Sequence, residues 1–194
     1  MERTKRLADI LVNYSLTIKK DDIIIIQCDK ASIPLAQECY RLILERGAFP
    51  RIKFSLPGQQ YIYFNHAKNN HLTNMSKLDL EEMKKSAGII MIKSSDNTKE
   101  LTNIDPKKVA LKRKANHPIH KIRWKKDNWV IVGYPSNGQA QDAGMSLEEF
   151  EDFVFGATNI DWNKGRKIET KVKKILDSGK QVRIVGKETD ITFS

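Results

Sequence analysis

The chain has 194 residues, of which 40% are hydrophobic and 30% are charged, and its formal net charge is +10. This composition is that of a globular protein and excludes a disordered tail or a fibrous repeat. No apolar run exceeds the four residues of Ile23 to Ile26, whereas a membrane-spanning helix needs ~20, so we expect a cytoplasmic protein with no membrane partner. Two cysteines, Cys28 and Cys39, are too few for a disulfide framework and are expected to be reduced and inert.

The first half of the chain alternates helical and extended patterns. Apolar side chains at helical spacing, β-branched runs and turn residues mark the elements in turn. They predict a helix over 4–18, a strand over 23–28, a helix opened by Ser32 and ended by Gly47, and an extended segment over 49–54. Helix, strand, helix, strand is the order from which parallel sheets are built.

The second half continues this alternation. The patterns predict helical pieces over 59–75, a helix over 78–86, a strand over 88–92, a basic helix opened by Asp105 and interrupted at Pro118, a strand over 129–132, an acidic helix opened by Ser146, a helix over 168–176 and a strand over 182–185. Residues 189–194 alternate as a further strand would. We therefore expect one α/β domain over 1–194, Rossmann-like and three-layered, with a mainly parallel sheet of about five strands and helices on both faces.

Charge is segregated along the chain. Residues 105–126 carry nine bases and one acid, residues 142–161 carry six acids and no base, and residues 164–187 carry nine bases and two acids. The first basic stretch also contains Trp124, so it has the charge and one aromatic ring that a nucleic-acid surface uses. No nucleic-acid fold signature accompanies it, and a solvated helix face is the simpler interpretation.

A search for catalytic and binding motifs assigns no catalytic, cofactor-binding or metal residue. The four histidines, His66, His71, His117 and His120, have no acid or cysteine at ligand spacing. The acids Glu148, Glu149, Glu151 and Asp152 are interpreted as the solvated face of a helix. The loop 29–32 after the first strand lacks the glycine that a dinucleotide-binding turn requires.

Several stretches nevertheless resemble one family in the right order. They are Leu7 to Leu16 before the strand at Asp22, Ile33 to Pro50, Trp129 to Ser136, Ala140 to Phe155, and Gly186 to Phe193 with its Thr189-Asp190-Ile191 element. Together they are similar to the N-terminal domain of the thermophilic metallo-aminopeptidases of the aminopeptidase T type. Two mild departures are Ser136 in place of a usual Thr and Asp21-Asp22 in place of Gly-Asp.

The resemblance implies a longer, two-domain enzyme that removes N-terminal residues from peptides with two divalent metal ions. In that family the ligands, mainly Glu, His, Tyr and Asp, follow an Asn-x-Pro-x-Gly-Glu-like segment of the catalytic C-terminal domain, which does not occur in these residues. No residue is therefore carried over as a metal ligand, and we expect this chain to be inactive alone. The expected partners are the catalytic domain, peptide substrates and a second copy in a homodimer.

The sequence leaves one alternative from another class of function. A free-standing nucleic-acid-binding or protein-binding module would use the basic segment 105–126 as its surface. In the enzyme fragment, the same segment would instead attract the C-terminal carboxylate of peptides.

Overall fold

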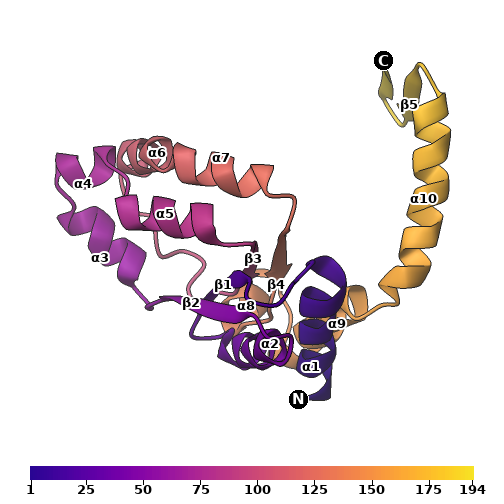
Figure 1. Cartoon of the computed structure of the whole chain (residues 1–194). Coiled ribbons are helices and arrows are strands. Elements are labelled where there is room, and N and C mark those ends of the chain that lie inside the picture. Colours follow the sequence, from indigo (N-terminus) through magenta and orange to yellow (C-terminus); the bar gives the residue numbers. More distant parts are fainter. The chain divides into compact units, whose positions relative to one another are not determined.

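The computed structural model describes residues 1–194, which form two compact units, 1–159 and 160–194. The first unit contains a four-stranded parallel sheet of β1 (Ile23–Asp29), β2 (Phe49–Ser55), β3 (Gly88–Lys93) and β4 (Trp129–Gly133) (Figure 1). The strand order is β2-β1-β3-β4. Ile26 of β1 pairs with Ile52 of β2 and with Ile90 of β3, so the hydrophobic strands are in register across the centre of the sheet.

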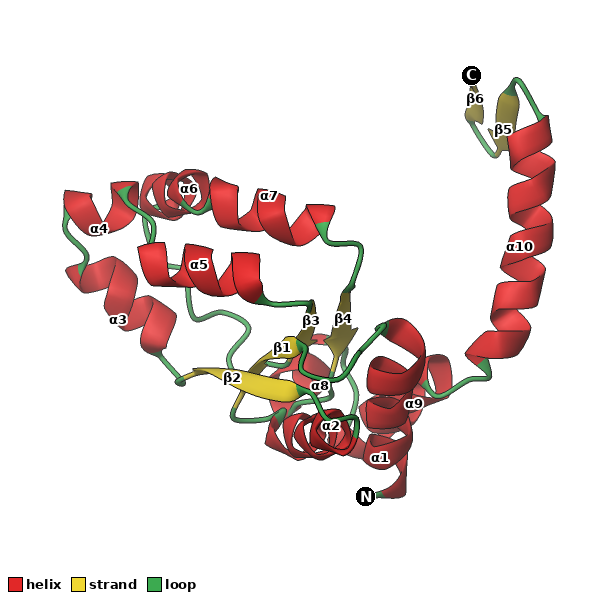
Figure 2. Ribbon diagram, viewed as in Figure 1, coloured by secondary structure: helices red, strands yellow, loops and turns green.

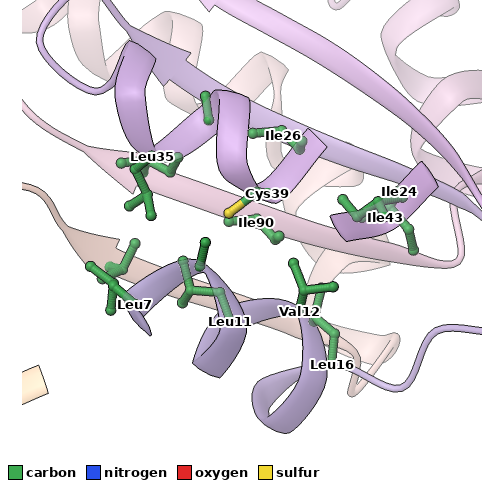
Figure 3. Close-up of a cluster of buried hydrophobic side chains, with 14 of the residues drawn as sticks. Leu7, Leu11, Val12, Leu16, Ile24, Ile26, Leu35, Cys39, Ile43 and Ile90 are labelled. Carbon is green, nitrogen blue, oxygen red and sulfur yellow. The ribbon is translucent and has the colours of Figure 1, made fainter. Parts of the chain in front are cut away.

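One face of the sheet is covered by the N-terminal helices and α2 (Ile33–Glu45). The first helix, α1 (Glu2–Asp9), continues as a π-helical turn, η1 (Ile10–Ser15). Figure 3 shows Leu7, Leu11, Leu35 and Cys39 of these helices packed against Ile24, Ile26 and Ile90 of the sheet. Phe155 of α9 (Leu147–Thr158) joins the same core cluster. This is the larger part of the hydrophobic core.

The opposite face is covered by α5 (Lys77–Lys85) and α7 (His117–Lys125) (Figure 2). Met83 of α5 packs with Ile25, Ile89 and Met91, which alternate along their strands with the residues of the first face. In a smaller cluster, Phe64 of α3 (Gln59–His66) and Leu72 of α4 (Asn69–Thr73) pack with Ile104, which precedes α6 (Pro106–Ala115), and Val109 of α6 packs against them. The prediction of a mainly parallel sheet with helices on both faces is therefore confirmed.

The basic segment folds as two helices because Pro118 stands near the start of the second. The first, α6, is capped by the Asp105 side chain, which accepts a hydrogen bond from the Lys107 amide. Asn116 ends α6 and begins α7. A proline is tolerated in the first turn of a helix and not in its interior, so the chain restarts where Pro118 occurs.

The second unit contains α10 (Trp162–Ser178) and a hairpin of β5 (Val182–Gly186) and β6 (Thr189–Phe193). The two strands pair antiparallel, with Ile184 opposite Ile191. The predicted fifth strand thus lies in a separate sheet, and the main sheet has four strands. The physical reason is the two-residue turn at Lys187-Glu188, because so short a connection joins only antiparallel strands. None of the chain's helices combines the length and apolar composition needed to cross a membrane.

Candidate functional site

A crevice of about 840 Å³ opens at the carboxyl ends of β1, β2 and β3. The connection after β1 leads to the neighbouring strand β2 through α2, whereas the connection after β3 leads in the other direction to β4 through α6 and α7. The loops that follow β1 and β3 consequently diverge. In open α/β sheets, ligands bind at this kind of switch point, outside the carboxyl ends of the strands.

The loop after β1 is closed on itself by side-chain hydrogen bonds. The Asp29 amide donates to Ser32 Oγ at 2.9 Å, the Ser32 amide donates to Asp29 Oδ1 at 3.2 Å, and Ser32 Oγ lies 3.0 Å from that same carboxylate oxygen. These two amide N–H groups are occupied within the loop. They do not serve as the free donors with which glycine-rich loops bind a phosphate.

The loop after β3 is held by the short helix α8 (Asn137–Asp142). Ser136 caps α8 and donates from Oγ to the Ser95 carbonyl oxygen at 2.6 Å. A Cβ atom on Gly138 would lie only 2.6 Å from the Asp96 carbonyl oxygen. Only glycine permits this approach of α8 to the loop, so the loop that forms one wall of the crevice is fixed in place.

Charged side chains of both signs line the crevice. Lys53 is bound to Asp79 at 2.5 Å and to Glu82 at 2.7 Å. Burial lowers the pKa of Lys53, but these two carboxylates together raise it above its usual value. Lys30, Lys93 and Asp96 also line the crevice, are exposed, and form no ion pair.

Two further residues of the crevice lining, Cys28 and Ser94, differ in their chemical properties. Burial, with the Asp29 charge in addition, raises the pKa of the Cys28 thiol, so its nucleophilic thiolate is disfavoured. The Ser94 hydroxyl is buried and has no hydrogen-bond partner, and the residue is only 8% exposed. A buried hydroxyl without a partner is costly and uncommon in folded proteins.

The histidines and acids considered in the sequence are dispersed. His71 Nδ1 accepts a hydrogen bond from the Lys68 amide at 3.0 Å, and His120 stacks on Trp124 with ring centroids 6.0 Å apart. Burial, and then the charges of Arg123, His117 and Arg113, lower the pKa of His120. Glu149 completes the capping box of α9, which lowers its pKa, and Asp152 pairs with Arg3.

No three His, Cys, Asp or Glu side chains come together in a group that could hold a metal ion.

Three lysines of the basic segment bind carbonyl oxygens at the ends of other helices. Lys108 Nζ donates to the Phe64 carbonyl at 2.9 Å, near the end of α3. Lys112 Nζ donates to the carbonyls of His71 and Asn74 at 3.1 and 2.8 Å, at the end of α4. Lys126 Nζ donates to the Lys84 and Ser86 carbonyls at the end of α5. Cations at these positions complement the negative ends of the helix dipoles, which gives these three of the nine bases a structural role.

The motif search did not identify the crevice residues, although their positions at the ends of predicted strands indicated them. Lys30 and Ser94 each directly follow a strand that the sequence predicts, and Lys93 is the last residue of β3. In a parallel sheet, residues that follow the strands gather at one edge. No recognised spacing links them, because the sheet brings together loops that lie far apart in the sequence.

The fold has a counterpart among solved structures. The structure titled "Wild-type AmpT from Thermus thermophilus" matches 81% of this chain with a TM-score of 0.64 and 18% sequence identity. At this identity the match shows a shared fold, an α/β arrangement around a parallel sheet. The chain spans 43% of the length of AmpT. A search of curated protein sequences gives no match.

The family follows from the sequence profile. The profile described as "Thermophilic metalloprotease (M29)" matches residues 1–194, the whole chain. This chain therefore belongs to the M29 family of thermophilic metalloproteases, in agreement with the resemblance of its motifs.

Proposed function

We propose that this chain is the N-terminal, non-catalytic half of a metal-dependent aminopeptidase that removes N-terminal residues from peptides. One observation carries the proposal. The metalloprotease family profile matches all 194 residues, yet the chain spans only 43% of AmpT and its side chains form no group that could hold a metal ion. In this proposal, the two divalent metal ions are bound by the other half of the enzyme.

The exposed apolar face of α10, in the second unit, supports an association with another protein or protein domain. Its helix α10 carries Ile168, Val172, Ile175 and Leu176 on one face, and these side chains are 50–70% exposed. The spacing is that of an amphipathic helix, whose apolar face is normally buried against another element. Apolar surface of this kind marks a site of contact with protein, and we assign the contact to the catalytic half.

A hydrolysis assay with a leucyl anilide tests the proposal that this chain is non-catalytic. We expect no turnover above the background rate of free metal ions, with Zn²⁺, Co²⁺ or Mn²⁺ added in turn, because no ligand group retains the ion. A full-length enzyme of the family in the same buffers is the positive control. Metal-dependent turnover by this chain, abolished by a chelator, would contradict the proposal.

A further inference from the structure

We propose that a groove along α6 binds a medium-chain fatty acid, that is, an apolar chain that ends in a carboxylate. The groove has a volume of about 590 Å³, within the ~300–1,000 Å³ of small-molecule sites. It is formed by α6, by the residues that precede α6 and by His117 at the start of α7, and it shares no lining residue with the crevice. The proposal goes beyond the proposed function, because it involves no metal ion, no peptide and no hydrolysis.

Most of the groove is lined by apolar side chains that the fold holds in place. They are Leu101, Ile104, Pro106, Val109 and Ala110. Ile104 is buried in a cluster with Phe64 and Leu72, and Leu101 and Val109 pack against that cluster. The apolar floor is therefore the outer surface of a packed core. A hydrocarbon chain on this floor would remove apolar surface of both partners from water, which favours binding.

The orientation of α6 determines which of its side chains face the groove. Lys108 and Lys112 bind carbonyl oxygens at the ends of α3 and α4. Pro106, Val109 and Arg113 line the groove and succeed one another at spacings of three and four residues, which place them along one face of the helix. Seven residues of helix span ~10 Å. The groove therefore accommodates an extended chain of medium length along α6.

The basic residues of the groove lie towards the C-terminal end of α6. Arg113, Lys114 and His117 line it there, and no acid lines the groove anywhere. Neither Arg113 nor Lys114 forms an ion pair. His117 is the first residue of α7, and the positive end of that helix dipole also favours an anion. A carboxylate at this end would form charge-assisted hydrogen bonds with the guanidinium or the ammonium group.

This arrangement favours a single anionic group on a hydrocarbon chain over a polymer. A nucleic-acid strand carries a charge at every phosphate, so it would place further charges over the apolar floor. A peptide would bring an N–H and a C=O group with nearly every residue, whereas Thr102 is the one polar side chain in the lining outside the basic end. A fatty acid places its charge beside the bases and its methylene groups on the apolar side chains.

Calorimetric titration of the 194-residue chain tests the ligand class. The probes are acetate, octanoate, decanoate, octan-1-ol, a single-stranded oligonucleotide and an acidic peptide, with the amphiphiles kept below the concentrations at which they form micelles. We expect decanoate to bind about fivefold to tenfold more tightly than octanoate, because two more methylene groups are buried. Acetate and octan-1-ol should each bind about tenfold or more weakly than octanoate, because one lacks the chain and the other lacks the charge.

Three results of the titration would overturn the inference. They are equal affinities for octan-1-ol and octanoate, tighter binding of the oligonucleotide or the acidic peptide than of decanoate, and no binding of decanoate at millimolar concentration.

Variants then test the assigned residues. Ala110→Glu should weaken decanoate binding about tenfold or more, because it places a negative charge on the exposed apolar floor. The double variant Arg113→Gln with Lys114→Gln should weaken decanoate binding about tenfold and leave the affinity for octan-1-ol unchanged. Lys107→Gln with Lys121→Gln is the matched control, since it removes the same charge from exposed lysines outside the groove. Circular dichroism checks that each variant is folded. Unchanged decanoate affinity in the folded groove variants, or an equal loss in the control, would refute the assignment.

Discussion

Single residues fix the geometry of the crevice, and Gly138 is the clearest case. A methyl group at this position would meet the backbone of Asp96 and Ser95 at 2.6–2.7 Å, and backbone cannot move aside as a flexible side chain would. Gly138→Ala should therefore lower the free energy of unfolding by ~1–3 kcal/mol. Urea denaturation measures the change.

Gly156 provides the matched control for that substitution. It lies in α9, and a Cβ atom added there would have no neighbour within 4 Å. Gly156→Ala should raise the free energy of unfolding by ~0.5–1 kcal/mol, because alanine loses less backbone entropy in a helix. Equal effects of the two substitutions would show that the close approach of α8 to the loop is absent.

The buried thiol of Cys39 makes the free energy of unfolding depend on pH. Burial, with smaller contributions from the charges of Glu38 and Cys28, raises the pKa of its thiol to about 12. The unfolded chain ionises this thiol from about pH 8.5 upwards. Below that pH the thiol is protonated in the folded and the unfolded chain, and its burial contributes fully to the free energy of unfolding. Between about pH 9 and 12 only the unfolded chain releases the proton, so this contribution to the free energy of unfolding is lost as the pH rises.

The experiment compares the chain with Cys39→Ala over this range. The free energy of unfolding of the unmodified chain should fall relative to that of the variant by ~1.4 kcal/mol per pH unit. The alanine variant is less stable at pH 7 because it leaves a cavity, and the difference should shrink as the pH rises. A difference that stays constant from pH 8 to 11 would contradict the burial of this thiol.

Among the elements, the basic helices show what the charge pattern alone does not predict. The sequence places nine bases in residues 105–126 and leaves a nucleic-acid surface open as an interpretation. The structure directs three of them, Lys108, Lys112 and Lys126, to the carbonyl ends of α3, α4 and α5. No local pattern predicts this, because the acceptor carbonyls lie 38–44 residues earlier in the chain.

Lys112 allows this structural role to be measured. Lys112→Met removes two hydrogen bonds to the end of α4 and should lower the free energy of unfolding by ~1–2 kcal/mol. Lys107→Met, also in α6 but at its exposed N-terminal end, should change the free energy of unfolding by less than ~0.5 kcal/mol. Chemical denaturation of both variants distinguishes a specific contact from general charge reduction. Indistinguishable stabilities would restore the interpretation of a merely solvated basic face.

The elements themselves were largely predictable, whereas their pairing was less so. Alternating apolar runs located all four strands of the main sheet, and Pro118 located the break between α6 and α7. These are local signals. The pairing of β5 with β6 depends on the turn at Lys187-Glu188, where Glu188 adopts a φ of 56°. Glutamate seldom adopts this conformation, so the turn carries no obvious sequence signature.

At the scale of the whole molecule, fold and family agree. The parallel sheet matches AmpT, and the family profile covers the complete chain. No three His, Cys, Asp or Glu side chains form a group that could hold a metal ion. We therefore assign to this chain the scaffold of the proposed enzyme, and we assign peptide hydrolysis to a partner half.

Reconstitution of aminopeptidase activity in trans tests that central claim most directly. The chain is mixed with a separately produced catalytic half of an M29 enzyme, and metal-dependent release of leucine from leucyl-leucine is measured. We predict turnover only in the mixture, and its loss when Ile175→Asp places a charge on the apolar face of α10. Turnover by this chain alone, or by the mixture at no more than the rate of the catalytic half alone, would contradict the account.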